Sequence, residues 1–156
     1  MAEAGIIAAL YFALTMAVAP LSFGQLQLRV SEALCVLPFF TPAAIPGLFI
    51  GCVLANIFSF LGVFDIVFGS LATLAAALIT YTIKNKWLLP LPSVVVNAFA
   101  IGALLYFLAD LPFWLSAAYV GAGQAIACYA LGMPLFFLLA KHRDRLFGRR
   151  NGNQSR

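Results

Sequence analysis

The stretch IVFGSLATLAAALITYTI runs from Ile66 to Ile83 without a charged side chain, and Lys84-Asn85-Lys86 follows it directly. As an α-helix, this stretch would extend about 27 Å at a rise of 1.5 Å per residue. That length is close to the thickness of the hydrocarbon core of a bilayer. The stretch therefore predicts a membrane-spanning helix that ends at a basic loop.

The composition of the whole chain agrees with this prediction. Of its 156 residues, 64% are hydrophobic and 9% are charged, whereas about a quarter of the residues in a soluble domain are charged. A globule this small has too much surface to hide such an apolar excess. We expect an all-α integral membrane protein, with residues 1–140 as the transmembrane domain and residues 141–156 as a disordered basic cytoplasmic tail.

Five further apolar segments flank the first one. They cover residues 4–20, 33–40, 44–60, 93–108 and 114–139. The segment 33–40 is too short to cross a bilayer alone, so we expect it to be tilted, short or partly re-entrant. The N-terminal segment lacks the positive flank of a signal peptide, and we expect a retained helix there. Together the segments predict a six-helix transmembrane bundle.

The basic residues predict the orientation of this bundle. An even number of helices places both termini and the loop at residues 84–86 on one side. Eight of the nine Lys and Arg residues then share that side, and only Arg29 lies opposite. The positive-inside rule makes that side cytoplasmic, and we expect the basic tail to contact lipid headgroups rather than nucleic acid.

Small side chains recur every four residues in the first segment, at Gly5, Ala9, Ala13 and Ala17. This spacing places them along one helix face, where small residues let helices approach closely in lipid. The pattern alone favours packing within the chain over docking of a partner.

The polar residues of the apolar segments are the candidate ligand contacts. They are Arg29, Glu32 and Asp65 toward the outer side and Asn56, Asn97, Gln124 and Tyr129 within helices. The carboxylates favour a cationic ligand, and the amides suit the edge of a heterocyclic base. Other roles stay open, because Arg29 and Glu32 could pair with each other and Asp65 could cap a helix.

The motifs of several function classes are missing. The sequence has no Walker A motif, no paired metal-ligand histidines and no hydrolase elbow, and Cys35, Cys52 and Cys128 have no metal or redox spacing. We therefore expect a protein that is not an enzyme and that binds no cofactor or metal of its own.

Longer blocks of the sequence resemble the QueT family over most of the chain. They are PLSFG (20–24), QLRVSEAL (27–34), LPFFTPAAIPG (37–47), DIVFGSLAT (65–73), LPSVVVNA (91–98) and CYALGMPL (128–135). The resemblance implies a queuosine-precursor transporter of the bacterial plasma membrane. It further implies an S component, the substrate-binding subunit of an energy-coupling factor (ECF) type ABC importer with six helices.

The resemblance also implies a ligand and partners. The ligand would be 7-aminomethyl-7-deazaguanine or a related cationic deazapurine, captured at the outer face under a loop at residues 23–32. A transmembrane coupling subunit would dock on Gly5, Ala9, Ala13 and Ala17, and two cytoplasmic ATPases would supply the energy of ATP. An autonomous small-molecule transporter, or an S component for another vitamin-like heterocycle, is the alternative. Proton coupling usually needs a buried acid, and the sequence offers no clear mid-span acid.

Overall fold

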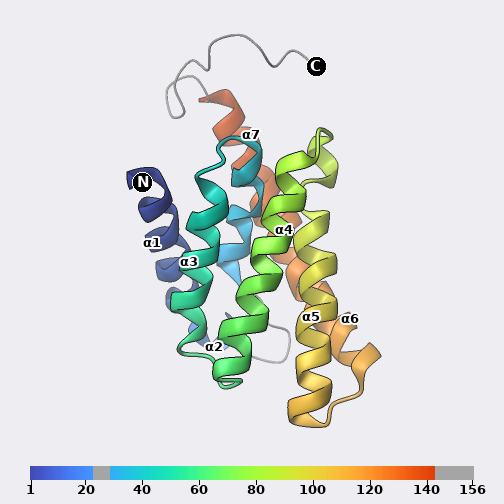
Figure 1. Cartoon of the computed structure of the whole chain (residues 1–156). Coiled ribbons are helices and arrows are strands. Elements are labelled where there is room, and N and C mark those ends of the chain that lie inside the picture. The colour runs from blue at the N-terminus through green and yellow to red at the C-terminus, as the bar shows by residue number, and fades with distance from the viewer. Residues whose placement is uncertain (23–28, 143–156) are drawn as a thin grey trace.

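A computed structural model describes residues 1–22 and 29–142, and within these ranges the chain is helical (Figure 1). The helices in chain order are α1 (Ala2–Ala17), α2 (Ala19–Ser22), η1 (Val30–Phe39), α3 (Ala44–Asn56), η2 (Asp65–Gly69), α4 (Ser70–Thr82), η3 (Lys86–Leu88), α5 (Leu91–Ala109), α6 (Phe113–Ala125), η4 (Ile126–Gly132) and α7 (Met133–Lys141). Every apolar segment of the sequence forms a helix, so the all-α fold is confirmed. Most of the loop expected at residues 23–32 and of the basic tail expected at residues 141–156 lies outside the described residues.

Length and composition divide these helices into two groups. Asp65–Thr82, Lys86–Ala109 and Phe113–Lys141 are long and apolar enough to cross a membrane, whereas Ala2–Ala17, Val30–Phe39 and Ala44–Asn56 are shorter. Among the described residues, three helices therefore have the length and composition to cross a membrane. The prediction that all six segments cross the bilayer stays a prediction.

The short segment η1 is a 3₁₀ helix at the centre of the bundle. It packs against α1, α4, α7 and η4, and its residues 31–38 are all buried. Pro38 lies inside it and cannot donate a backbone hydrogen bond. Ten residues rise about 20 Å in a 3₁₀ helix, compared with about 15 Å in an α-helix. The prediction that this segment is short is confirmed.

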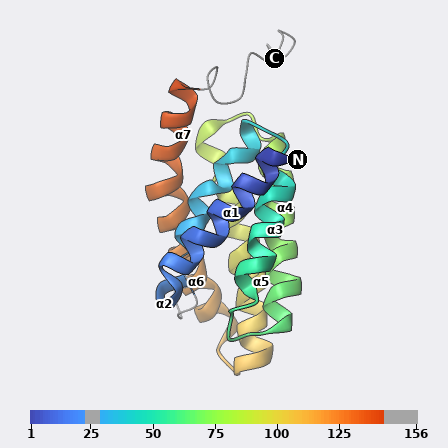
Figure 2. The ribbon, with the colours of Figure 1, turned by 90° about the vertical axis from the view of Figure 1, so that its left-hand side faces the viewer.

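Two glycines let α1 and α3 lie close together (Figure 2). A Cβ atom on Gly47 would lie 2.9 Å from the carbonyl oxygen of Ala4, and one on Gly51 would lie 2.7 Å from Cβ of Tyr11. The two glycines are four residues apart, which is the G-x-x-x-G spacing of close helix pairs in membranes. The close contact of α1 therefore depends on glycines of α3.

The small-residue stripe of α1 faces away from the bundle. Gly5, Ala9, Ala13 and Ala17 are all exposed, while the buried side chains of α1 are Ile7, Ala8, Tyr11 and Thr15. The interpretation that this stripe packs within the chain is wrong, because the opposite face of the helix makes those contacts.

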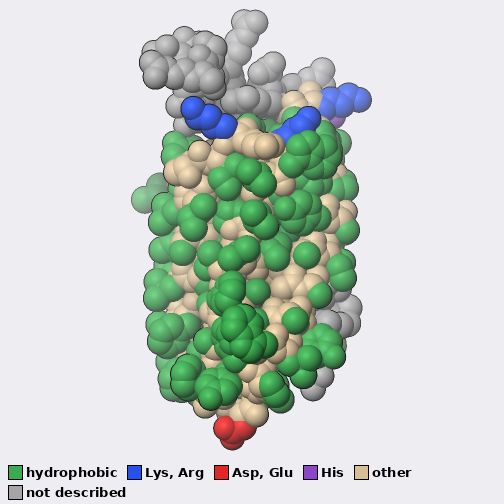
Figure 3. Space-filling view, turned by 90° about the vertical axis from the view of Figure 1, so that its right-hand side faces the viewer, with side chains coloured by type: hydrophobic (Ala, Val, Ile, Leu, Met, Phe, Trp, Pro, Cys, Tyr) green, Lys and Arg blue, Asp and Glu red, His purple; other side chains and the backbone are tan. Residues whose placement is uncertain are grey.

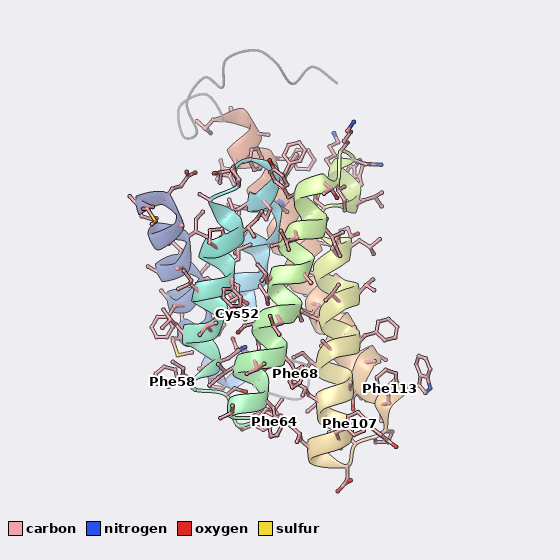
Figure 4. The ribbon with its side chains drawn as sticks, viewed as in Figure 1. Cys52, Phe58, Phe64, Phe68, Phe107 and Phe113 are labelled. Carbon is pink, nitrogen blue, oxygen red and sulfur yellow. The ribbon has the colours of Figure 1, made fainter. Side chains whose placement is uncertain are left out.

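Charged side chains gather at the two ends of an otherwise apolar surface (Figure 3). The N-terminus, the connection that carries Lys84 and Lys86, and the end of α7 lie at one end, which we call the basic end (Figure 1). The connection that carries Asp110 lies at the opposite, acidic end. Phe58, Phe64, Phe68, Phe107 and Phe113 lie in the half of the bundle nearer the acidic end (Figure 4).

Candidate functional site

A set of polar side chains is buried inside the apolar bundle, and we call it the polar layer. Its members are Tyr11, Thr15, Arg29, Ser31, Glu32, Asn56, Asp65, Ser70, Thr73 and Gln124, each at most 5% exposed. Polar groups are costly inside a membrane bundle, and they usually mark a substrate or ion site there. The polar layer is therefore the candidate functional site.

An ion pair forms one half of the polar layer. Arg29 Nη2 lies 3.1 Å from Asp65 Oδ2, and both side chains are almost completely buried. Asn56 Nδ2 donates to the backbone carbonyl of Asp65 at 2.8 Å, which ties the end of α3 to the start of η2. The carboxylate of Asp65 binds Arg29 through Oδ2, and its Oδ1 has no hydrogen-bond partner among the described residues, so it does not cap its own helix.

The thiol of Cys52 accepts hydrogen bonds in the same half of the layer. Asn56 Nδ2 lies 3.4 Å and Thr73 Oγ1 lies 3.3 Å from Cys52 Sγ, and Arg29 Nη1 lies 3.9 Å from it. Cys52 lies near mid-height on α3 (Figure 4). All three cysteines are free and buried.

The other half of the layer surrounds Glu32. Tyr11 donates its phenolic hydrogen to Glu32 Oε1 at 2.6 Å, and Thr15 Oγ1 donates to Ser31 Oγ at 2.7 Å. These two bonds attach α1 to η1. Tyr11 and Thr15 were missed in the sequence, although two hydroxyls four residues apart on a face opposite a small-residue stripe could have indicated them.

The last long helix reaches the same half through a π-helical segment. Cys128 Sγ lies 3.6 Å from the backbone carbonyl of Glu32 and 3.7 Å from Gln124 Oε1. Cys128 belongs to η4, and π segments within α-helices occur frequently at functional sites. The structure therefore brings Gln124 close to Glu32, although 92 residues of sequence separate them.

The remaining candidates lie in different surroundings. Asn97 is 3% exposed on α5, and its Nδ2 has no hydrogen-bond partner among the described residues. Tyr129 is half-buried, and its hydroxyl donates to the backbone carbonyl of Trp87 at 3.2 Å. Tyr129 thus bonds the segment next to α5 rather than the polar layer.

The polar layer has a charge balance that bears on its ligand. Its described residues include one basic side chain, Arg29, and two acids, Glu32 and Asp65. With all three ionised, the formal charge is −1. A buried charge is costly unless a partner balances it, so the arrangement suits an additional cation.

Comparison with known proteins identifies the family of the chain. A relative from Lactococcus lactis subsp. cremoris (strain MG1363), named "Queuosine precursor transporter QueT", is 44% identical over 71 residues, covering 44% of this chain and 41% of the relative. The chain thus matches less than half the length of that relative, and no solved structure matches it. The family described as "QueT transporter" matches residues 1–141, and the chain therefore belongs to the QueT transporter family.

Proposed function

We propose that this chain is the substrate-binding membrane subunit, or S component, of an ECF-type importer for a cationic deazapurine. The polar layer carries this proposal, because it places carboxylates and amides inside an apolar bundle. The ligand that fits is 7-aminomethyl-7-deazaguanine or a close relative. This agrees with the name of the Lactococcus relative, which is a queuosine precursor transporter.

The chemistry of the ligand matches the side chains of the layer. The protonated aminomethyl group needs a carboxylate, and Glu32 and Asp65 each offer one. The guanine-like edge needs both donors and acceptors, which the amides of Asn56, Asn97 and Gln124 provide. Arg29 holds Asp65 through its guanidinium, so one carboxylate of the layer has a fixed position.

The distribution of charge supports an orientation. Lys84 and Lys86 share the basic end with the N-terminus and the end of α7 (Figure 1). The positive-inside rule places this end in the cytoplasm, so both termini are cytoplasmic and the acidic end faces outward. The six helical segments then cross the bilayer alternately, with η1 enclosed by its neighbours rather than by lipid.

The exposed stripe on α1 supports docking of a partner. A transmembrane coupling subunit can approach α1 closely over Gly5, Ala9, Ala13 and Ala17, because these residues present no bulky side chain. Two ATPases bound to that subunit would supply the energy. This chain then binds its ligand alone and moves it only in the assembled complex.

We expect Ala13→Trp to abolish assembly with the coupling subunit while ligand affinity stays within about twofold. The indole would lie between α1 and the coupling subunit, and overpacking of a close interface costs about 1–3 kcal/mol or more. Co-purification of the tagged complex and calorimetry on the isolated chain measure the two effects. Leu10→Trp on the same helix, also exposed but outside the stripe, is the matched control. Normal assembly of Ala13→Trp would contradict docking on this stripe.

We expect the purified chain to bind 7-aminomethyl-7-deazaguanine in detergent with a stoichiometry near one, and to bind riboflavin and guanine much more weakly. In Gln124→Ala, affinity is expected to fall roughly 5- to 150-fold, because an unsatisfied polar contact costs about 1–3 kcal/mol. Isothermal calorimetry measures both results. Failure of the folded protein to bind any deazapurine would overturn the assignment.

The rival function is an autonomous, ion-coupled transporter. It needs a buried acid, and the structure buries both Glu32 and Asp65, although the sequence offered no clear mid-span acid. Uptake by proteoliposomes that contain only this chain separates the two functions. Uptake driven by an ion gradient would support the rival, whereas uptake only with the coupling subunit, the ATPases and ATP would support the S component.

A further inference from the structure

Three oxygen atoms lack hydrogen-bond partners at the place where α3 ends and α4 begins. They are Asn56 Oδ1, Asp65 Oδ1 and Ser70 Oγ, and all three residues are completely buried. Among the described residues, none donates a hydrogen bond to these atoms. A buried polar atom without a partner costs about 1–3 kcal/mol and normally indicates a missing water, ion or ligand group.

The backbone brings these three residues to one place. Gly69 lies against both Asp65 and Asn56, because a Cβ atom on Gly69 would collide with Asp65 Oδ1 and would lie 2.9 Å from Asn56 Nδ2. Asp65 and Gly69 bound the π turn η2, in which hydrogen bonds run from residue i to residue i+5. Ser70 directly follows Gly69 at the start of α4 and is completely buried, as Asp65 is.

The partners already present explain which atoms stay available. Arg29 binds Oδ2 of Asp65, so Oδ1 of Asp65 stays available as an acceptor. The amide nitrogen of Asn56 donates to the backbone carbonyl of Asp65, so Oδ1 of Asn56 also stays available as an acceptor. Glu32, the other buried acid, already accepts a hydrogen bond from Tyr11 on Oε1. The acceptors thus accumulate around Asp65 rather than around Glu32.

A primary ammonium group is the partner whose chemistry fits these acceptors. It carries three N–H donors and no acceptor, which equals the number of available oxygen atoms. It also carries a positive charge, which attracts the Asp65 carboxylate and strengthens the hydrogen bond to it. A water molecule could fill the space, but it carries no charge and donates only two hydrogen bonds.

We propose that Asn56, Asp65 and Ser70 form the binding site for the primary ammonium group of the ligand, and that this site selects amines over neutral compounds of the same ring. The inference rests on the proposed function and adds the group that determines specificity. The exocyclic amine contacts Asp65, Asn56 and Ser70, while the heterocycle extends toward the remaining amides. A deazaguanine whose aminomethyl group is replaced by a neutral hydroxymethyl group loses the charged contact.

The test compares two ligands on the wild-type protein and on one variant by calorimetry in detergent. The ligands are 7-aminomethyl-7-deazaguanine and 7-hydroxymethyl-7-deazaguanine, and the variant is Ser70→Ala. We expect the wild-type protein to bind the amine at least about tenfold more tightly, since hydrogen bonds to charged groups contribute about 1.5–3 kcal/mol. Ser70→Ala is expected to lower the affinity for the amine about fivefold and to leave the affinity for the neutral compound unchanged.

Ser93→Ala is the matched control, because Ser93 is a buried serine near the start of α5, toward the basic end. It should change neither affinity. Equal affinity of the wild-type protein for both ligands would overturn this inference and leave the proposed function standing. An equal loss for both ligands in Ser70→Ala would also overturn it, because the hydroxyl would then act on the ring or on the fold. Failure to bind either ligand would instead overturn the proposed function.

Discussion

Replacing Asp65 by alanine is expected to destabilise the bundle by about 3–5 kcal/mol, because it removes the carboxylate that balances a buried guanidinium. Arg29 and Asp65 are almost completely buried in the structure, so water cannot replace the lost partner. Thermal unfolding in detergent and the monodisperse fraction on size exclusion measure the loss. Asp110→Asn, which removes an exposed carboxylate at the acidic end, should change stability by no more than about 0.5 kcal/mol.

A double variant separates the ion pair from other roles of Asp65. Arg29→Met combined with Asp65→Leu replaces both charges with apolar groups, which often restores or exceeds the stability of a buried pair. We therefore expect the double variant to unfold near the wild-type temperature and to bind no ligand. A double variant as unstable as Asp65→Ala would show that Asp65 stabilises the fold mainly through contacts other than this pair.

Gly51→Leu is expected to separate α1 from α3 and to lower the yield of folded protein sharply. Even a Cβ atom at this position would lie 2.7 Å from Cβ of Tyr11 and 2.8 Å from the carbonyl oxygen of Ala8. Backbone cannot move aside cheaply, so the cost exceeds the about 1–3 kcal/mol usual for overpacking. Ligand binding should be lost as well, because Tyr11 donates to Glu32.

Gly5→Leu is the control for this prediction. No atom lies within 4 Å of the Cβ position of Gly5, and leucine favours helix over glycine by up to about 1 kcal/mol. Its thermal stability should equal or exceed that of the wild type. An equal fall in the unfolding temperatures of Gly51→Leu and Gly5→Leu would contradict the unequal roles of Gly51 and Gly5.

The helical fold follows from the sequence because one physical signal dominates it. Apolar runs without charge require backbone groups to satisfy one another, and proline, charge and turn residues mark their ends. The prediction for residues 66–83 agrees closely with the structure, in which η2 and α4 together cover Asp65–Thr82. Whether the shorter helices also cross the bilayer depends on tilt and on neighbouring helices, which the length of a segment does not determine.

The candidate site was only partly predictable, because residue type indicates burial better than it indicates partners. Arg29, Glu32, Asn56, Asp65 and Gln124 were selected as rare polar residues in apolar segments, and the structure places all five in the polar layer. The pairing of Arg29 with Asp65 rather than with the nearby Glu32 depends on where Arg29 and η2 lie in three dimensions. Tyr11 and Thr15 were missed because hydroxyl residues are common in membrane helices.

The orientation of the small-residue stripe could not be predicted for a related reason. Hydropathy hardly distinguishes the faces of α1, because both are dominated by apolar side chains. The glycines that accommodate α1 lie on α3. Gly47 is 30 residues and Gly51 is 34 residues beyond Ala17, the last residue of α1. The G-x-x-x-G spacing of Gly47 and Gly51 is visible in the sequence, but it does not indicate which helix packs against these glycines.

The attachment of α1 depends on forces of short range. In a bilayer, lipid would surround its outer face as favourably as protein would, so no hydrophobic drive would hold α1 in place. Hydrogen bonds from Tyr11 and Thr15 and close packing on Gly47 and Gly51 hold it instead, and both interactions weaken steeply once atoms separate. A small displacement of α1 therefore costs most of the interaction energy between α1 and the rest of the bundle. Beyond that displacement, little further energy resists complete separation.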